Sequence, residues 1–235
     1  MNIALIIAGG VGNRMGQDVP KQFINIFDKP VIVYTLEAFQ KHPSIDEIYV
    51  VCLEGWHDIL RAYAKQFSIS KLMDVFKGGS TAQESIRNGV YGIKSANKND
   101  NIIIHDGVRP MVDGYVLSDV IAKCTEYGNA VSSMPYNEQI FIKEDEKSTK
   151  KYIPRDTLRR VATPQAYKYD KLLWAYDKAF SENIGISSSS YTNTMMVELG
   201  ETLYFAAGSD RNIKLTTKDN LEIFKAYIVM EKNHA

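Results

Sequence analysis

The sequence predicts an α/β protein built on a doubly wound, mostly parallel sheet. Short apolar runs rich in β-branched residues recur along the chain, and longer stretches with apolar residues at a helical period lie between most of them. The runs are continuously apolar rather than alternating, which is typical of parallel strands covered by helices on both faces. The chain has 235 residues, so we expect a single domain over residues 1–235.

Strands are expected at residues 2–8, 47–53, 75–77, 101–105, 130–134 and 202–206. Helices are expected at residues 31–40, 56–67, 82–94, 114–127, 169–180 and 218–231. The two kinds of segment alternate, as they do in βαβ units. Ligands of such sheets bind at the carboxyl ends of the strands, so polar residues that follow a strand are the candidates for a site.

The alternation breaks at residues 136–151, where Ile140 and Ile142 alternate beside a charged turn. This pattern predicts a β-hairpin that leaves the sheet, within a protruding arm over residues 136–155. Two interpretations stay open: the arm packs on a partner subunit, or it lies solvated over its own domain. The serine run at residues 187–190 predicts a loop.

The amino-acid composition limits the classes of partner that we expect this protein to bind. The 28 Lys and Arg residues balance 28 Asp and Glu residues, which argues against nucleic acid or an anionic membrane surface as the main partner. No apolar run approaches the roughly 18 residues of a membrane span, and the amino terminus lacks the basic region of a signal peptide. Cys52 and Cys124 lie in apolar stretches without a second thiol or a histidine at metal-ligand spacing, which favours buried thiols and a cytoplasmic location.

The first expected strand ends in a glycine-rich turn made of Ala8, Gly9, Gly10 and Gly12. Glycines at this place let the backbone approach a phosphate closely, and consecutive N–H groups form an anion-binding nest. Arg14 and Lys21 add two cations beside it, which favours a triphosphate. A dinucleotide stays an alternative because Glu54 follows the second strand, although the spacing departs from Gly-x-Gly-x-x-Gly. The third interpretation is a tight turn that binds no ligand.

Two further segments place polar residues after strands. Gly79, Ser80 and Ser85 follow one strand and open a helix, where small residues leave room for a flat ring. Asp106 ends another strand, either as a ligand or in an i,i+3 salt bridge with Arg109. Its neighbour His105 is more typical of a hydrogen-bonded structural histidine than of a base.

Taken together, the motifs resemble one family, the IspD/TarI-like cytidylyltransferases, which join CTP to methylerythritol phosphate or ribitol phosphate. The resemblance rests on Ala8-Gly9-Gly10-x-Gly12-x-Arg14-Met15, Pro20-Lys21-Gln22, Gly78-Gly79, Ser85, His105-Asp106-x-x-Arg109-Pro110, Arg155, Thr163-Pro164-Gln165, Thr192 and Asn212-Ile213-Lys214-Leu215-Thr216. It implies a Rossmann-like nucleotidyltransferase fold of the glycosyltransferase-A type and a homodimer in which the arm carrying Arg155 is exchanged.

The resemblance also implies roles for individual residues. The first glycine turn (Ala8, Gly9, Gly10 and Gly12), with Arg14 and Lys21, would hold the CTP triphosphate, and Gly79, Ser80 and Ser85 would border the cytosine. The acceptor, a phosphorylated alcohol, would lie among Asp106, Arg109, Arg155, Thr163, Thr192 and Lys214. Without the resemblance, Lys214 would be interpreted as a surface lysine beside Asp210.

The acceptor phosphate is already an anion at neutral pH, so the reaction needs cations rather than a general base. Arg14, Lys21 and Lys214, together with Mg²⁺ on the CTP phosphates, would neutralise the transition state, and Asp106 would hold the metal or an acceptor hydroxyl.

Two departures from the family pattern bear on the acceptor. Family members commonly carry an arginine where this chain has Thr81-Ala82-Gln83, and an aspartate where it has Asn193. Both departures favour a polyol phosphate such as ribitol 5-phosphate, a precursor for cell wall or capsule, over methylerythritol phosphate. An NAD-dependent oxidoreductase and a non-catalytic nucleotide-binding module are the more distant alternatives.

Overall fold

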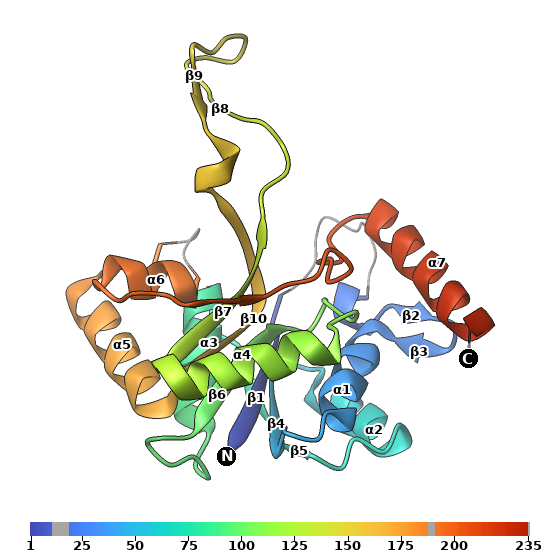
Figure 1. The fold of residues 1–235 in the computed structure, drawn as a ribbon. Helices are drawn as coiled ribbons and strands as arrows, with labels where there is room; N and C mark the ends of the chain where they lie inside the picture. Colours follow the sequence, from blue (N-terminus) through green and yellow to red (C-terminus); the bar gives the residue numbers. More distant parts are fainter. Residues whose placement is uncertain (11–18, 188–190, 235) are drawn as a thin grey trace.

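In the computed structural model, a seven-stranded sheet with helices on both faces forms the body of the molecule (Figure 1). The structure describes residues 1–10, 19–187 and 191–234. The strand order is β11 (Phe205–Ala207), β7 (Asn129–Pro135), β10 (Arg159–Lys168), β6 (Asn101–Asp106), β1 (Asn2–Ala8), β4 (Glu47–Cys52) and β5 (Leu72–Lys77). Every pairing is parallel except those of β10, which runs antiparallel to β6 and β7. The predicted mostly parallel sheet is therefore confirmed.

Helices cover both faces because the strand residues alternate between them. Along β1, Ala4 and Ile6 pack on α1 (Val31–Lys41), α2 (His57–Gln66) and α4 (Gly114–Tyr127). Ile3 and Leu5 face α3 (Ala82–Gly92), α5 (Tyr169–Glu182) and α6 (Thr192–Glu198). The carboxyl-terminal helix α7 (Lys218–His234) packs separately, against the short hairpin of β2 (Asn25–Ile26) and β3 (Lys29–Pro30).

Strand β10 is an element that the sequence did not predict. The chain leaves the sheet after β7, traces the arm and returns along β7, so the returning strand must run antiparallel to it. Its register shifts between Val161 and Gln165, where Pro164 has no N–H to donate to a ladder. The resulting bulge places Thr163 beside the end of β6. Helix α6 was also not expected.

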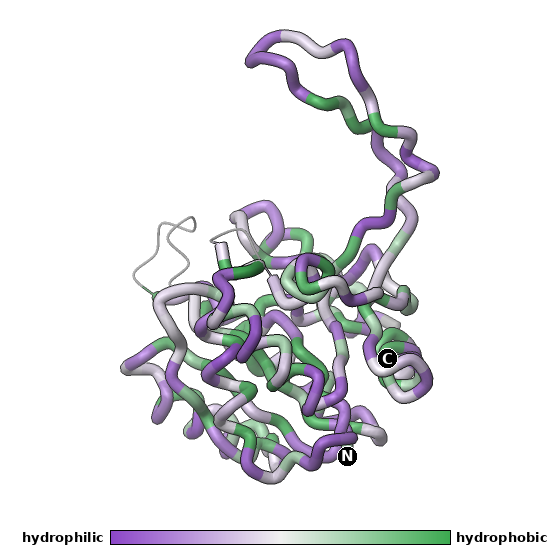
Figure 2. Tube along the Cα trace, turned by 90° about the vertical axis from the view of Figure 1, so that its left-hand side faces the viewer, coloured by the Kyte–Doolittle hydropathy of each residue, from purple (hydrophilic) through white to green (hydrophobic). Residues whose placement is uncertain are grey.

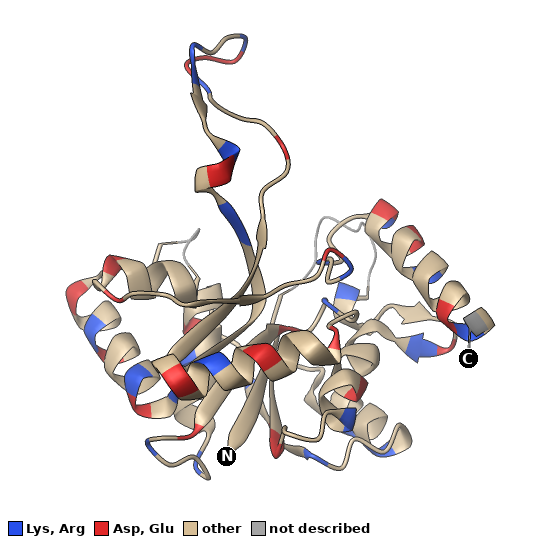
Figure 3. Ribbon diagram, in the orientation of Figure 1, with Lys and Arg blue, Asp and Glu red and all other residues tan. Residues whose placement is uncertain are grey.

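The arm stands away from its own domain (Figure 1). It carries β8 (Ile140–Ile142), β9 (Lys151–Ile153) and the single turn η3 (Arg155–Thr157). Phe141 and Tyr152 are 58% and 64% exposed. A short hydrophobic stretch interrupts an otherwise mostly hydrophilic arm (Figure 2). Acidic and basic residues mix at its tip (Figure 3). The hairpin thus projects from the domain in this structure, and its packing on a partner subunit stays a prediction.

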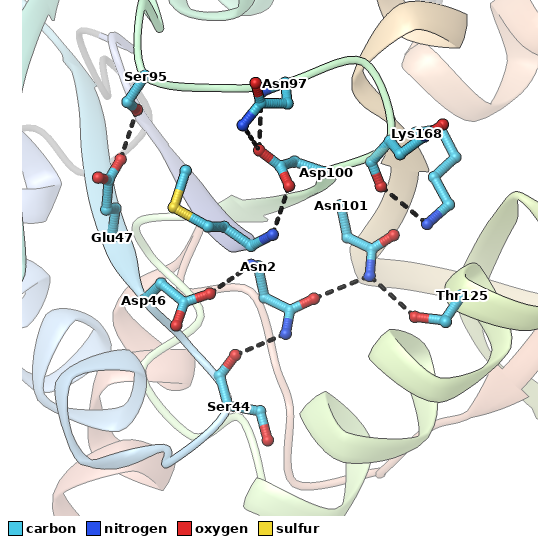
Figure 4. A network of polar contacts seen from close by, with 12 residues as sticks. Asn2, Ser44, Asp46, Glu47, Ser95, Asn97, Asp100, Asn101, Thr125 and Lys168 are labelled. Atoms are coloured by element: carbon cyan, nitrogen blue, oxygen red, sulfur yellow. Dashed lines mark hydrogen bonds and ion pairs between the residues drawn. The ribbon is translucent and has the colours of Figure 1, made fainter.

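A polar network fixes the amino-terminal ends of the central strands (Figure 4). Asn101 Nδ2 donates to Asn2 Oδ1 at 2.8 Å and to Thr125 Oγ1 at 3.0 Å, and Asn2 Nδ2 donates to the Ser44 carbonyl at 2.8 Å. These bonds hold β1 and β6 in a register that pairs Ile7 with Asp106 at the opposite edge of the sheet. Within the described residues, none of the helices is sufficiently long and apolar to cross a membrane.

Candidate active site

A cavity of about 370 Å³ opens at the carboxyl ends of the parallel strands, the edge where such sheets bind ligands. Its lining comes from both glycine turns and from segments far apart in the sequence. The predicted site residues in the lining are Ala8, Gly9, Gly10, Lys21, Gly79, Ser80, Ser85, Asp106, Thr163 and Lys214. The structure thus brings most of the predicted site together in one place. Gly12 and Arg14 lie outside the described residues.

The first glycine turn is held open by Gln22. This buried side chain donates from Nε2 to the carbonyl oxygens of Ala8, at 2.8 Å, and Gly10, at 3.0 Å. A side chain at Gly10 would meet no atom within 4 Å among the described residues, so packing does not require a glycine there. Lys21 belongs to the same short segment, η2 (Lys21–Phe23), and lines the cavity. Gln22, for which the sequence analysis gave no role, therefore fixes the described start of the turn.

The second glycine turn is organised by its own side chains. Ser85 Oγ accepts the Gly79 N–H at 2.9 Å and donates to the Thr81 carbonyl at 2.9 Å. Glu84 Oε2 accepts the Ser80 N–H at 2.7 Å. A Cβ on Gly79 would lie 2.3 Å from the Glu84 Cβ, so the glycine is required by contact with Glu84. The contact with Glu84 thus explains the glycine at position 79 without the reason given from the sequence, which was room for a flat ring.

Asp106 lies between two cations. Its Oδ2 accepts from Arg109 Nε at 2.8 Å, and its Oδ1 accepts from Lys214 Nζ at 3.1 Å. Burial by itself would raise the pKa of Asp106, but Lys214 and Arg109 outweigh it and lower the pKa to about 2. The i,i+3 salt bridge with Arg109, one of the two alternatives for Asp106, is present. The surface alternative for Lys214 is wrong, because Asp210 pairs with Arg160 and Lys214 reaches the cavity.

The remaining contacts fix this carboxylate in place. Thr163 Oγ1 accepts the Asp106 N–H at 3.1 Å, and Asn212 Nδ2 donates to the Thr163 carbonyl at 2.6 Å. Arg109 Nη1 donates to the Asn212 carbonyl at 2.7 Å. Arg109 is not among the residues that line the cavity, so in this chain its guanidinium supports Asp106.

His105 is a neutral structural residue, as the sequence predicts. It is fully buried, and its Nε2 lies 3.0 Å from the Arg109 carbonyl, to which it can donate. Burial disfavours the imidazolium and lowers the pKa of His105 to about 4. The ring therefore shapes the turn between Asp106 and Arg109 without contributing charge.

Besides Arg109, two more predicted acceptor ligands, Arg155 and Thr192, lie outside the cavity lining. Arg155 is on the arm, exposed, with Nη1 donating to the Asn137 carbonyl at 3.0 Å. Thr192 is fully buried, and its Oγ1 lies 2.8 Å from the Tyr176 hydroxyl. Tyr191, which the sequence analysis missed, does line the cavity, and its ring centroid is 5.7 Å from Lys214 Nζ. No sequence signal singled it out, because it follows a low-complexity serine run.

The dinucleotide alternative has no support in this geometry. Glu54, which would hold a ribose, pairs at the surface with Lys77, and neither residue lines the cavity. Both cysteines are buried, and burial raises the pKa of the Cys52 thiol to about 11 and that of the Cys124 thiol to about 12. These thiols stay protonated and take no part in the chemistry.

A resident metal ion would find few ligands here. Among the described residues, no group of three or more His, Cys, Asp or Glu side chains could hold one, and Asp106 is the one carboxylate in the cavity lining. A single carboxylate fits Mg²⁺ that keeps several waters and is bound mainly by substrate phosphates.

Comparison with known proteins identifies the family. Residues 2–230 match the family described as "IspD: 2-C-methyl-D-erythritol 4-phosphate cytidylyltransferase". The chain belongs to this family of cytidylyltransferases. It is thus a nucleotidyltransferase, as the motifs predict.

Relatives within the family carry two names. A "ribitol-5-phosphate cytidylyltransferase" of Lacticaseibacillus paracasei is 61% identical over 229 residues, which cover 97% of this chain and 98% of the relative. A "2-C-methyl-D-erythritol 4-phosphate cytidylyltransferase" of Clostridium acetobutylicum is 37% identical over 235 residues, which cover 99% of both chains.

Solved structures in the family share the fold. The 4-diphosphocytidyl-2C-methyl-D-erythritol synthase of Anaerococcus prevotii superposes with a TM-score of 0.80 at 21% identity, covering 96% of this chain and 97% of the other. The Rossmann-like cytidylyltransferase fold expected from the sequence is therefore confirmed.

Proposed function

We propose that this chain transfers the cytidylyl group of CTP to ribitol 5-phosphate and releases pyrophosphate. The observation that carries the proposal is one cavity lined by both glycine turns, Lys21, Asp106 and Lys214. The acceptor follows from the relative that is 61% identical over nearly the whole chain. The two departures from the family pattern agree with it, since Ala82 lines the cavity and Asn193 follows Thr192 at the start of α6.

In the reaction, an oxygen of the acceptor phosphate attacks the α-phosphorus of CTP. A new P–O bond forms, and the bond from the α-phosphorus to the bridging oxygen of the β-phosphate breaks, so pyrophosphate leaves with that electron pair. The attacking oxygen is already an anion and needs no base. Asp106 agrees with this, because its pKa of about 2 leaves it ionised and without a proton to exchange near neutral pH.

The cations lower the main barrier, which is the repulsion between two polyanions. Lys21 lies at the first glycine turn, where the N–H groups and its ammonium would hold the triphosphate. Lys214 would receive the acceptor phosphate, and Asp106 fixes the ammonium of Lys214 in the cavity. One preorganised donor of this kind is commonly worth about 3–4 kcal/mol in the transition state. Arg14 stays a proposed third cation by its place in the family motif.

Magnesium is the proposed cofactor. Asp106 is the residue that would hold it, together with the phosphates of CTP, and the ion would supply further positive charge at the leaving pyrophosphate. This role needs one carboxylate in the cavity lining, and Asp106 is that carboxylate.

The second glycine turn is the proposed base pocket. The N–H groups of Gly79 and Ser80 already donate to Ser85 and Glu84, which leaves their carbonyl oxygens as the backbone groups to face a base. Carbonyl oxygens accept hydrogen bonds from the exocyclic amine of cytosine and repel the carbonyl of uracil at the same position. The turn therefore favours CTP over UTP.

The arm is proposed to complete the acceptor site of a second copy of the chain. Phe141, Ile142 and Tyr152 are exposed on a two-stranded hairpin, which is marginally stable without a partner. Arg155 lies at the base of this hairpin, and a guanidinium binds phosphate through two parallel hydrogen bonds. Exchange of arms would bury the apolar side chains and deliver Arg155 to the partner's acceptor.

A panel of acceptors tests the proposal. Pyrophosphate release from CTP is measured with ribitol, arabinitol, glycerol and methylerythritol phosphates at equal concentrations. Ribitol 5-phosphate should give the highest kcat/KM. A preference for methylerythritol phosphate would show that this compound is the acceptor instead. CTP binding without pyrophosphate release for any acceptor would show that the protein is a non-catalytic nucleotide-binding module.

A further inference from the structure

A line of three buried polar side chains connects α3 with α6, the two helices that begin beside the cavity. It consists of Gln83 on α3, Tyr176 on α5 and Thr192 at the start of α6, with exposed fractions of 1%, 0% and 0%. We propose that these three side chains form a positioning unit that holds Tyr191 against Lys214 and so sets the affinity for the acceptor. The proposal deepens the proposed function and rests on it.

The three side chains form a single line of hydrogen bonds. Gln83 Nε2 donates to the Gly185 carbonyl at 3.0 Å, and the Tyr176 hydroxyl donates to Gln83 Oε1 at 3.1 Å. Since that hydroxyl has one proton, its 2.8 Å contact with Thr192 must use the Thr192 proton. A flipped Gln83 amide would set Oε1 against the Gly185 carbonyl oxygen, so the direction of the whole chain is fixed. Gln83 Oε1 and the hydroxyls of Tyr176 and Thr192 thus depend on their neighbours in the line for a partner.

Both ends of this chain lie beside the cavity. Gln83 directly follows Ala82 and lies two residues before Ser85 on the first turn of α3, and both of these residues line the cavity. Thr192 directly follows Tyr191, which lines the cavity and places its ring under Lys214 at 5.7 Å. Both departures from the family pattern, Ala82 and Asn193, are neighbours of the unit in sequence. The position of Tyr191 is therefore tied to the helix that carries the nucleotide turn.

The same contacts point to a positioning role for Thr192. Its side chain has no exposed surface, and its hydroxyl proton is used by Tyr176. Gly185 packs tightly on the same helix, because an added Cβ would lie 2.7 Å from the Met195 Cα. The unit thus anchors both Gly185 and Thr192, and it acts on substrate through Tyr191.

The test separates positioning from stability. Thr192→Val keeps the shape but removes the hydroxyl, leaving the Tyr176 oxygen without its donor. We expect the KM for ribitol 5-phosphate to rise about tenfold, with the KM for CTP unchanged. Thr192→Ser restores a hydroxyl and should recover most of the acceptor affinity.

A matched pair on α5 provides the control. Tyr176→Phe should raise the acceptor KM as Thr192→Val does. Tyr169→Phe removes a hydroxyl whose one proton is shared between the Val90 and Ile93 carbonyls, at 3.2 and 2.9 Å. Tyr169 does not line the cavity. This variant should lower the melting temperature by a similar amount and leave both KM values unchanged.

A double variant decides the outcome. In a Tyr191→Ala background, Thr192→Val should raise the acceptor KM by less than about twofold, because its effect passes through Tyr191. The full effect in that background would overturn the proposal, as would equal rises in both KM values. If the wild-type enzyme turned over none of the acceptors, the proposed function itself would fail. A wild-type enzyme that is active, with variants that lack the KM split, would reject the positioning unit alone.

Discussion

Lys214 Nζ lies 3.1 Å from Asp106 Oδ1, although the two residues stand 108 positions apart in the sequence. Asp106 ends the central strand β6, and Lys214 belongs to the segment between β11 and α7. The segment is held there by the Leu215 N–H, which donates to the Val108 carbonyl at 2.9 Å. This contact joins the last predicted motif to the centre of the sheet.

Lys21→Ala should lower turnover by at least about a hundredfold while the protein stays folded, because the variant removes a cation from the proposed triphosphate site. Initial rates and melting temperature are measured side by side. Lys77→Ala is the control, since Lys77 is exposed and pairs with Glu54 outside the cavity. A Lys21→Ala enzyme with normal melting and a near-normal rate would reject the assignment.

The enzyme should prefer CTP over UTP by at least about a hundredfold in kcat/KM, because a site that accepts a hydrogen bond rejects a base that lacks the donor. The reason lies in the carbonyl oxygens of Gly79 and Ser80, whose N–H groups are already engaged. Steady-state rates with each nucleotide at saturating acceptor give the ratio. Equal rates would show that this turn does not face the base.

Asp106 should make the stability of the unliganded protein depend on pH in an acid window. Folding lowers its pKa from 3.8 to about 2, so the ionised carboxylate stabilises the fold above about pH 4, and this is lost as the pH falls towards 2. Asp106→Asn lacks the contribution, roughly 2 kcal/mol at neutral pH. Urea unfolding of both proteins should therefore converge between pH 4 and 2.

The control for this window is Asp210→Asn, which removes an exposed carboxylate paired with Arg160. Such surface pairs contribute little, so its unfolding curves should follow the wild type at every pH. If the difference between wild type and Asp106→Asn stayed constant down to pH 2, the carboxylate would not be held by its two cations.

Arg155→Ala should raise the acceptor KM and leave CTP binding largely unchanged, because alanine cannot replace the paired hydrogen bonds of a guanidinium to phosphate. Deleting the arm should have the same kinetic effect and also produce a monomer, as measured by light scattering. The substitution alone should leave the dimer intact.

Mixing Arg155→Ala with Lys21→Ala tests whether the site is shared. In a heterodimer with exchanged arms, one site receives both intact residues and the other collects both defects. Activity should therefore recover in purified heterodimers. Without recovery, Arg155 would serve its own subunit and the arm would act only in dimerisation.

Local sequence was sufficient for elements whose own residues favour one conformation. The apolar run at residues 2–8 and the amphipathic stretch at residues 114–127 became β1 and α4 with the predicted bounds. The glycine turns and Asp106 were likewise predictable, because polar residues after parallel strands converge at one edge. The strand pattern and the motifs were sufficient to predict that these residues share one cavity.

Tertiary structure decided the features that depend on distant partners. Strand β10 begins with Arg159 and Arg160 and contains Pro164, so its residues do not form a strand pattern, and pairing with β6 and β7 determines its conformation. Thr192 matches a binding motif, yet Tyr176 and Gln83 bury it in a hydrogen-bonded chain. The choice between Asp106 and Asp210 as the partner of Lys214 was also made by packing. Such contacts are set by how segments meet in space, and the sequence around each residue carries no record of its distant neighbour.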